Sequence, residues 1–355
     1  MGTYLLKRLL LIIPTLFGIM VINFVIVQFA PGGPVEQVLA ELTAPGMTTT
    51  GPVGGADVAA DDTGLASAGL DPALIADLER RFGFDRPMHE RFVMMMWNYV
   101  RLDFGDSYFQ DRPVTELVIE RLPVSISLGL WSLLLIYLIS IPLGVAKAVR
   151  DGSRFDIWTS VLIFVGYAIP GFLFAIVLVV LFAGGTYWEI FPLQGLTSPN
   201  FHEMSFPEQV RDYFWHLALP VTAITIGGFA TLTMLTKNSF IEELGKQFVL
   251  TARSKGINER RVLYGHVFRN AMLIVIAGFP AAFVGILFTG ALLIEVIFSL
   301  DGLGLLGYEA VLKRDFPILF GTLFVFTLLG LLLNVIGDLT YVLVDPRIDF
   351  ESRQM

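Results

Sequence analysis

Cysteine is absent from the 355 residues, and charged residues make up only 16% of them. Without cysteine the chain can form no disulfide, no thiolate metal site and no cysteine nucleophile. The charges are also unbalanced, because 32 acidic residues face 24 basic ones and leave a formal net charge of -8. A chain with this acidic excess has little means of neutralising phosphates, so we expect no nucleic-acid partner.

Motifs of common enzymes are missing as well. The chain contains neither the G-x-x-x-x-G-K-[ST] loop that cradles a triphosphate nor the G-x-S-x-G elbow of acyl-transfer enzymes. A G-x-G-x-x-G pattern occurs at Gly302, Gly304 and Gly307, but it falls between two apolar runs rather than between a strand and a helix. We therefore expect a tight outer turn there, and no catalytic residue, cofactor or metal on this chain.

Hydrophobic residues, in contrast, make up 55% of the chain. They gather in uncharged runs, and crossing a bilayer takes about 20 helical residues. Buried helices of a soluble protein would show a polar face, so such runs predict an all-α integral membrane protein with six transmembrane helices. The first run exceeds the apolar region of a signal peptide, about 7 to 15 residues, and is expected to remain as a span. The runs are 9–30, 122–146, 157–188, 213–236, 270–294 and 316–337.

Basic residues of the short loops fall mostly on one side of the predicted membrane. The amino terminus, the loop after the second run, the segment 237–270 and the tail 344–355 are rich in them. The opposite short loops hold Arg211, Lys313 and Arg314. By the positive-inside rule, both termini are expected in the cytoplasm.

The predicted outer loop, 31–121, has two parts. Residues 43–69 are mostly Gly, Ala and Thr, without an aromatic or basic residue, which predicts a flexible linker. Asp71-Pro72 then offers a helix start, and residues 89–102 repeat apolar side chains at helical spacing. We expect a small helical lobe over 71–112 on the outer face.

The second to fifth runs each carry an interior proline. Each proline removes a backbone hydrogen bond and tends to kink its helix. Bent helices are therefore expected in the predicted five-helix core, 122–343. The residues are Pro142, Pro170, Pro220 and Pro280.

The segment 237–270 is unusually long for a loop between two spans. Phe248, Val249 and Ala252 form a small apolar patch at helical spacing, flanked by basic residues, and Gly256 supplies a helix stop. We predict a short amphipathic helix on the cytoplasmic face. From the residues alone, a docking helix and a solvated or lipid-resting loop are equally consistent.

This segment resembles a known one. Phe248-Val-Leu-Thr-Ala-Arg-Ser-Lys-Gly256, followed by His266-Val-Phe-Arg-Asn-Ala271, is similar to the EAA-type coupling segment of ABC importer permeases of the dipeptide and oligopeptide branch. One position departs, because Leu250 stands where the general pattern has Glu. The resemblance extends along almost all of the chain, through Ala30-Pro-Gly-Gly-Pro34, Asp103-Phe-Gly-Asp-Ser107, Leu122-Pro-Val-Ser-Ile-Ser127, Gly166-Tyr-Ala-Ile-Pro-Gly171, Gly302-Leu-Gly304 and Asp345-Pro-Arg-Ile348.

The resemblance implies a multi-pass subunit of the bacterial inner membrane that passes oligopeptides, and microcin C-like peptides, inward by alternating access. Its implied partners are a homologous second permease, an ABC ATPase that holds the ATP and Mg, and an extracytoplasmic peptide-binding protein. The helix docking on that ATPase would comprise Phe248, Val249, Thr251, Ala252, Arg253, Lys255 and Gly256. Contact with the partner is expected mainly through the apolar patch, because exposed ion pairs contribute little.

Ionisable and polar residues near the membrane are a second kind of candidate. Glu295, Asn334 and Asp338 are possible path or gate residues, and the alternative is that the two acids cap helices or pair with basic side chains. A membrane-embedded enzyme using Glu295 or Asp338 is the other class considered, but the two acids are predicted at opposite ends of the bilayer, too far apart for paired acid and base work. An ion-coupled carrier would predict an internal repeat, and none is evident.

Overall fold

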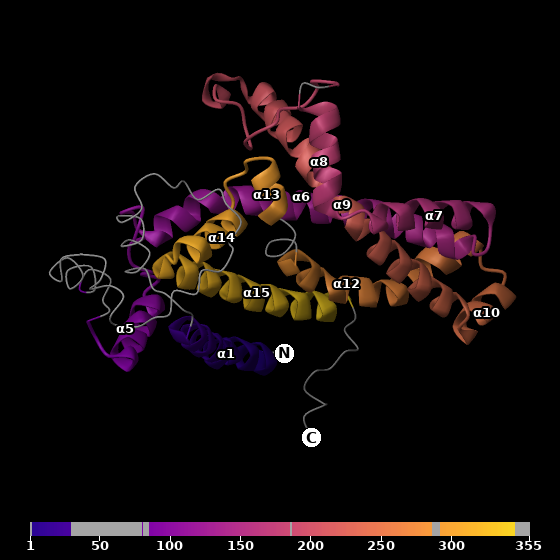
Figure 1. The fold of residues 1–355 in the computed structure, drawn as a ribbon. Coiled ribbons are helices and arrows are strands. Elements are labelled where there is room, and N and C mark those ends of the chain that lie inside the picture. Colours follow the sequence, from indigo (N-terminus) through magenta and orange to yellow (C-terminus); the bar gives the residue numbers. More distant parts are fainter. Residues whose placement is uncertain (1, 30–79, 81–84, 185–186, 286–291, 345–355) are drawn as a thin grey trace. The chain divides into compact units, whose positions relative to one another are not determined.

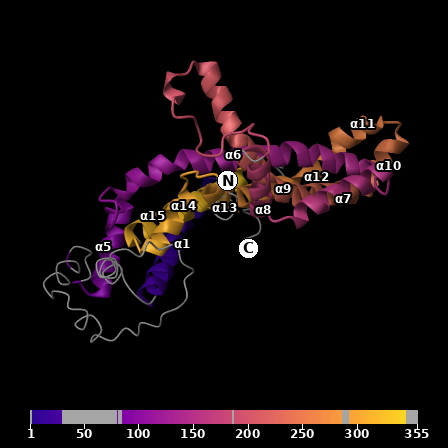
Figure 2. The same cartoon turned by 45° about the horizontal axis from the view of Figure 1, so that its top comes forward.

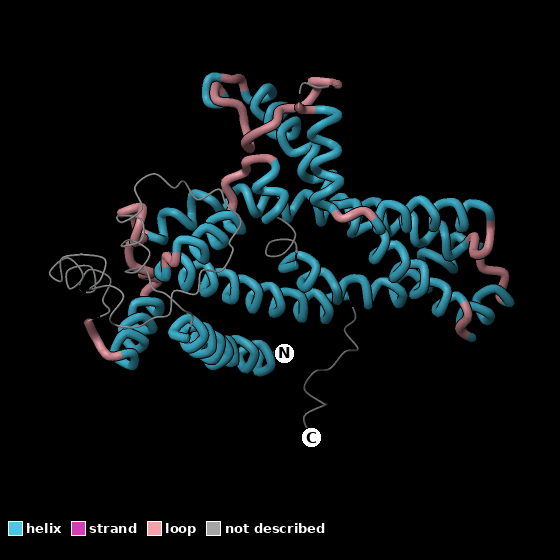
Figure 3. The backbone as a smooth tube through the Cα atoms, viewed as in Figure 1, coloured by secondary structure: helices cyan, strands magenta, loops and turns pink. Residues whose placement is uncertain are grey.

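The computed structural model describes residues 2–29, 80, 85–184, 187–285 and 292–344, and these fold as two compact units. Unit 1 takes its described residues from 2–12, 121–305 and 326–344, and unit 2 from 13–120 and 306–325. Within these residues the backbone forms helices joined by loops and no strand (Figure 3). The all-α prediction is therefore confirmed.

The predicted apolar runs correspond to helices (Figure 1). Among the described residues, five stretches are long and apolar enough to cross a membrane, and there are six when the bent pair α7 and α8 makes one crossing. The helices are α1 (Gly2–Phe29), α5 (Met88–Val100), α6 (Val114–Val149), α7 (Arg154–Ala168), α8 (Gly171–Phe182), η1 (Phe201–Glu203), α9 (Phe206–Leu244), α10 (Gln247–Ser254), α11 (Glu259–Val262), the π-helical turn η2 (Leu263–Val267), α12 (Phe268–Gly285), α13 (Leu292–Ile297), α14 (Leu303–Lys313) and α15 (Phe316–Val344).

Only one of the four interior prolines ends a helix. Pro142, Pro220 and Pro280 lie inside the continuous helices α6, α9 and α12. Pro170 instead separates α7 from α8, which meet at 91°. The residue before a proline is disfavoured in the helical region, and Ile169 is accordingly extended, with φ -88° and ψ 119°.

Unit 1 is built around α9, which packs against α7, α8 and α12. Glycine lets α6 approach α9 closely, because a Cβ on Gly228 would lie 2.4 Å from Ile136 Cδ1 and one on Gly144 would lie 2.6 Å from Thr236 Cβ. Close backbone approach over small residues is how membrane helices gain van der Waals contact without help from the hydrophobic effect. The unit therefore holds α6 and α9 as a tightly packed pair.

The helical spacing predicted over 89–102 corresponds to α5 in unit 2. Tyr99 of this helix stacks edge-on against Phe104, at a centroid distance of 4.9 Å, and against Phe324, at 5.3 Å. A left-handed turn at Gly105, with φ 77°, follows Phe104, and Ser107 donates to the buried Asp315 at 2.5 Å. The family-like segment 103–107 thus lies in the connection between α5 and α6, and Ser107 bonds this connection to Asp315, the residue that precedes α15. The predicted linker 43–69 and the first lobe helix lie outside the described residues.

The glycine pattern at 302–307 differs from the expected tight turn. Asp301 and Gly302 are non-helical, but Gly304 and Gly307 lie inside α14. The chain can enter a helix here because the carboxylate of Glu295 accepts a hydrogen bond from the Leu305 N–H at 2.7 Å. Orphan N–H groups at a helix start need such an acceptor, which a sequence pattern does not specify.

Candidate functional site

The predicted amphipathic helix is present as α10. The helix begins after Lys246, and Lys255 caps its carboxyl end. Gly256 follows in the left-handed conformation, with φ 75°. The Gly256 N–H donates to the Arg253 carbonyl at 2.9 Å, which satisfies one of the free carbonyls at the helix end. The helix lies beside α11 at one end of unit 1 (Figure 2).

The inner face of α10 is buried within the chain itself. Val249 is fully buried and Ala252 is 7% exposed. With Phe248 they join an apolar cluster that holds Phe240 of α9 and Val262 and Val267 of the following segment. The helix is therefore seated on α9, α11 and η2 by side-chain packing, and it can move only together with the structure beneath it.

This burial corrects the expectation about the docking contact. Val249 and Ala252 cannot offer their surface to another protein while they fill the cluster below α10, because a side chain that is almost fully buried has no free surface. The outer face of α10 consists of four exposed residues at the i, i+3, i+4 and i+7 positions of the helix. We call them the α10 outer stripe: Gln247, Leu250, Thr251 and Ser254. Leu250 is 57% exposed and is the apolar member of the stripe.

Two basic residues at the ends of α10, Lys246 and Arg253, are paired within the chain. Arg253 donates from Nε and Nη2 to the two carboxylate oxygens of Glu259, at 2.8 and 3.0 Å. Lys246 donates to Glu243, and this hydrogen bond raises the pKa of Lys246 above its ordinary value. These side chains are exposed or partly exposed, so their pairing adds little stability and mainly orients them at the rim of the helix.

Sequence reasoning missed Gln247, Leu250 and Ser254 as surface candidates. The signal was available, because residues 247, 250, 251 and 254 recur at the i, i+3, i+4 and i+7 spacing of one helix face. Nothing in the sequence, however, states which of the two faces the rest of the chain covers. That choice depends on α9, α11 and η2, which are folded back against α10.

Glu295, a candidate path or gate residue, is fully buried in α13. Its carboxylate accepts from Ser125 Oγ at 3.2 Å and from the Leu305 N–H at 2.7 Å. A Cβ at Gly302 would lie 2.3 Å from Glu295 Oε1, and one at Gly304 would lie 3.0 Å from Oε2. The two glycines therefore make room for this carboxylate, and the structure gives Glu295 the helix-capping role that was the alternative to a path role.

Asp338 and Asn334 lie on α15. Asp338 Oδ2 is 2.7 Å from Arg8 Nη1, so this acid pairs with a basic side chain, as the second interpretation predicted. Asn334 is exposed on the same helix. The structure does not bring Glu295 and Asp338 together through any described contact, and among the described residues no group of His, Asp or Glu is arranged to hold a metal ion.

A cavity of about 580 Å³ opens between α6, α9 and α12 in unit 1. Its walls are almost entirely apolar, and Tyr137 and Thr231 contribute the hydroxyl groups. Small residues line part of it: Gly228, Gly278, Ala282 and Gly285. The cavity is therefore an apolar hollow with two hydroxyl groups between three helices of unit 1.

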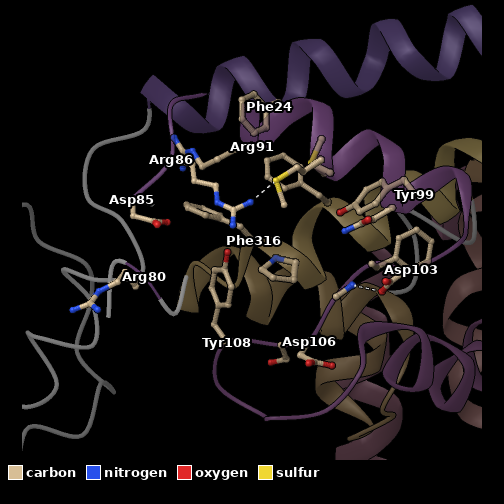
Figure 4. Close-up of a pocket in the computed structure, with 18 of the residues that line it drawn as sticks. Phe24, Arg80, Asp85, Arg86, Arg91, Tyr99, Asp103, Asp106, Tyr108 and Phe316 are labelled. Carbon is tan, nitrogen blue, oxygen red and sulfur yellow. Dashed lines mark hydrogen bonds between the residues drawn. The ribbon is translucent and has the colours of Figure 1, made fainter. Parts of the chain in front are cut away.

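A second cavity, of about 620 Å³, lies in unit 2 (Figure 4). Figure 4 shows Arg86 and Arg91 in its upper part with Asp85 nearby, Asp103 at the right and Asp106 at the bottom. Burial raises the pKa of the Tyr108 hydroxyl, which also lines this cavity, so the ring stays neutral at physiological pH. The cavity thus offers both signs of charge beside aromatic rings.

Residues 140–350 match the family model described as binding-protein-dependent transport system inner membrane component. This region contains α10, the α10 outer stripe and the α9 and α12 walls of the apolar cavity, while the α6 residues that line the cavity, Leu133, Ile136 and Tyr137, precede it. The chain therefore belongs to this family of multi-pass inner-membrane transport components.

Relatives extend the match to the whole chain. The inner membrane ABC transporter permease protein YejB of Escherichia coli O157:H7 is 58% identical over 364 residues, covering 99% of this chain and 100% of the relative. The peptidoglycan transport system permease protein YejB of Agrobacterium fabrum is also 58% identical, covering 100% of both chains. The oligopeptide transport system permease protein AppB of Bacillus subtilis is 32% identical, over 99% of this chain and 100% of the relative. The resemblance to ABC importer permeases, and within them to YejB, is confirmed.

Proposed function

We propose that the chain is the permease subunit of an ATP-driven importer of short peptides, and that an ABC ATPase docks on the α10 outer stripe. The observation that carries this proposal is a helix with one face packed into the chain and the other exposed around Leu250. A docking helix must be rigid if movement of a partner is to reach the spans, because coupling requires contacts that differ between two states. An unpacked loop would absorb the movement instead.

Peptide is the cargo class that the relatives have in common. The name of the Bacillus subtilis relative specifies oligopeptide transport, and the name of the Agrobacterium fabrum relative specifies peptidoglycan transport. Peptidoglycan carries short peptides, so a peptide with variable attachments fits both names. Microcin C-like peptides, implied by the sequence resemblance, remain a prediction within this class.

The proposed path runs along the apolar cavity between α6, α9 and α12. Its hydroxyl groups and small residues suit a cargo that must pass without being held tightly. A homologous permease would supply the facing wall, and an extracytoplasmic binding protein would deliver the peptide. Both termini are proposed to be cytoplasmic, since the basic residues around α10 then lie on the positive inner side.

A complementation experiment tests this function. Cells that lack the chain are supplied with wild type, with Leu250→Asp or with Arg112→Gln, and uptake of a labelled tripeptide is measured together with copurification of the ATPase. Leu250→Asp should insert normally yet lose both the ATPase and uptake. Arg112→Gln, at an exposed ion pair with Glu116 distant in sequence from α10, should behave as wild type. Full uptake with the Leu250→Asp chain would contradict docking at the outer stripe, and unchanged uptake in cells without the chain would contradict peptide import.

A further inference from the structure

Four charged side chains meet where α6, α7 and α9 come together, and the function proposed above assigns them no role. Lys147, at the end of α6, is fully buried. Asp156 of α7 and Lys237 of α9 are almost fully buried, while Asp151 in the connecting turn is exposed. Two lysines and two aspartates balance in charge, and we call this group the four-charge cluster.

Lys147 ties α6 to α7. Its Nζ donates to the Asp156 carbonyl at 2.8 Å, to Thr159 Oγ1 at 2.9 Å and to Ser160 Oγ at 2.7 Å. It also lies 2.9 Å from Asp156 Oδ1. An ammonium has three N–H donors, so this buried lysine is fully satisfied by α7 and its charge is paired. Such a contact cannot slide without leaving a buried charge unpaired.

Lys237 adds α9 to the same group. Its Nζ lies 2.7 Å from Asp156 Oδ2 and 2.8 Å from Asp151 Oδ1. The Gly152 N–H, in a left-handed turn with φ 72°, donates to Asp156 Oδ2 at 3.2 Å. Asp156 is therefore held by α6, by the turn and by α9 at once.

Packing beside the cluster is equally tight. One turn before Lys147, a Cβ on Gly144 would lie 2.8 Å from Thr236 Cγ2 and 2.9 Å from the Thr233 carbonyl oxygen. The backbones of α6 and α9 are thus in direct contact next to the charges. Only Gly245 and Lys246 then separate the end of α9 from α10.

We propose that the four-charge cluster is the joint through which displacement of α10 moves α6, α7 and α9 as one block. Lys147, Asp156 and Lys237 are positioning residues, and the inference rests on the proposed docking of an ATPase on α10. Apolar helix contacts alone can shift by a turn at little loss of contact. Sliding these helices would instead leave the buried charges of Lys147, Asp156 and Lys237 unpaired, so the ion-paired group favours one arrangement and resists relative movement of the three helices.

The decisive variant is Lys237→Met combined with Asp151→Asn. It removes one charge of each sign and cuts α9 from the cluster, while the buried Lys147–Asp156 pair stays neutral and intact. The matched control is Lys313→Gln with Glu309→Gln, which removes an exposed ion pair elsewhere in the chain. Both are studied in the transporter purified with its partner subunits and placed in lipid vesicles.

The first measurement compares peptide uptake with peptide-stimulated ATP hydrolysis. The joint predicts that uptake by the double variant falls at least tenfold while stimulated hydrolysis stays within about twofold of wild type; the control should change neither. If uptake and hydrolysis fall in the same proportion, with less assembled complex, the cluster only stabilises the fold and the joint is refuted. Unchanged uptake refutes it as well.

A second measurement does not depend on transport. Because the chain has no cysteine, spin labels can be placed at Val149→Cys on α6 and Asn238→Cys on α9, both exposed positions. Wild type should give one narrow distance distribution with and without ATP, and the double variant should give a broader one with ATP. Equal widths in both proteins would overturn the joint. If wild-type vesicles took up no peptide, the proposed function would fail, and this measurement would still decide the joint.

Discussion

Truncating neighbouring residues of α10 should separate docking from folding. Leu250 is 57% exposed, whereas Val249 is fully buried. Leu250→Ala should leave thermal stability nearly unchanged and weaken ATPase binding. Val249→Ala should lower thermal stability and leave the affinity of the folded protein for the ATPase nearly unchanged. The two substitutions lie one residue apart, so general damage to the helix would affect both alike.

The expected sizes follow from burial. Fully burying a leucine is worth about 1.5 to 3 kcal/mol, and 57% of Leu250 remains to be covered, so docking should lose at most roughly 0.9 to 1.7 kcal/mol, or about four- to 17-fold in Kd. Removing the side-chain volume of Val249 leaves a cavity in the cluster below α10, which destabilises by about 2 kcal/mol. The two effects are large enough to be told apart.

The assay combines thermal unfolding of the permease with titration of the ATPase against permease in lipid nanodiscs. Thr251→Ser, on the same stripe but with little change in size, serves as the control and should leave both readouts within error of wild type. If Val249→Ala weakened ATPase binding at an unchanged melting temperature while Leu250→Ala had no effect, the assignment of the two faces would be wrong.

Three further predictions concern other parts of the chain. Gly302→Ala would place a Cβ 2.3 Å from Glu295 Oε1 and should destabilise the protein by about 1 to 3 kcal/mol. Gly285→Ala, whose Cβ would have nothing within 4 Å, should not destabilise it. The melting temperatures of the two variants should therefore differ, and equal values would contradict the close fit around Glu295. Asp315→Ala removes the acceptor of the Ser107 hydroxyl and should lower stability by about 1 to 3 kcal/mol in the same measurement, whereas a change under about 0.5 kcal/mol would mean that this buried bond contributes nothing. Deleting 43–69 should leave assembly of the transporter intact by size-exclusion chromatography, and loss of the complex would contradict the linker interpretation.

The glycine pattern at 302–307 illustrates how the same residues can mislead. The spacing of the glycines imitates a phosphate-binding loop, and its position between apolar runs argues against that function. The reason for the glycines is nevertheless tertiary. Glu295 of α13 lies where side chains at 302 and 304 would otherwise be, and its carboxylate caps α14. No local rule links an acid to glycines that follow it several residues later.

Class and crossing number follow from the sequence by itself, because six uncharged runs of sufficient length leave few ways to satisfy backbone hydrogen bonds except membrane helices. The helix α10 was also predictable, since helical spacing and a terminal glycine occur together between 248 and 256. Only the tertiary structure decided which face of α10 is free, that Pro170 ends its helix while Pro142 does not, and that Lys147 and Lys237 share Asp156. The physical reason is that burial and ion pairing depend on which distant segments fold against a residue, and sequence spacing records only its neighbours along the chain.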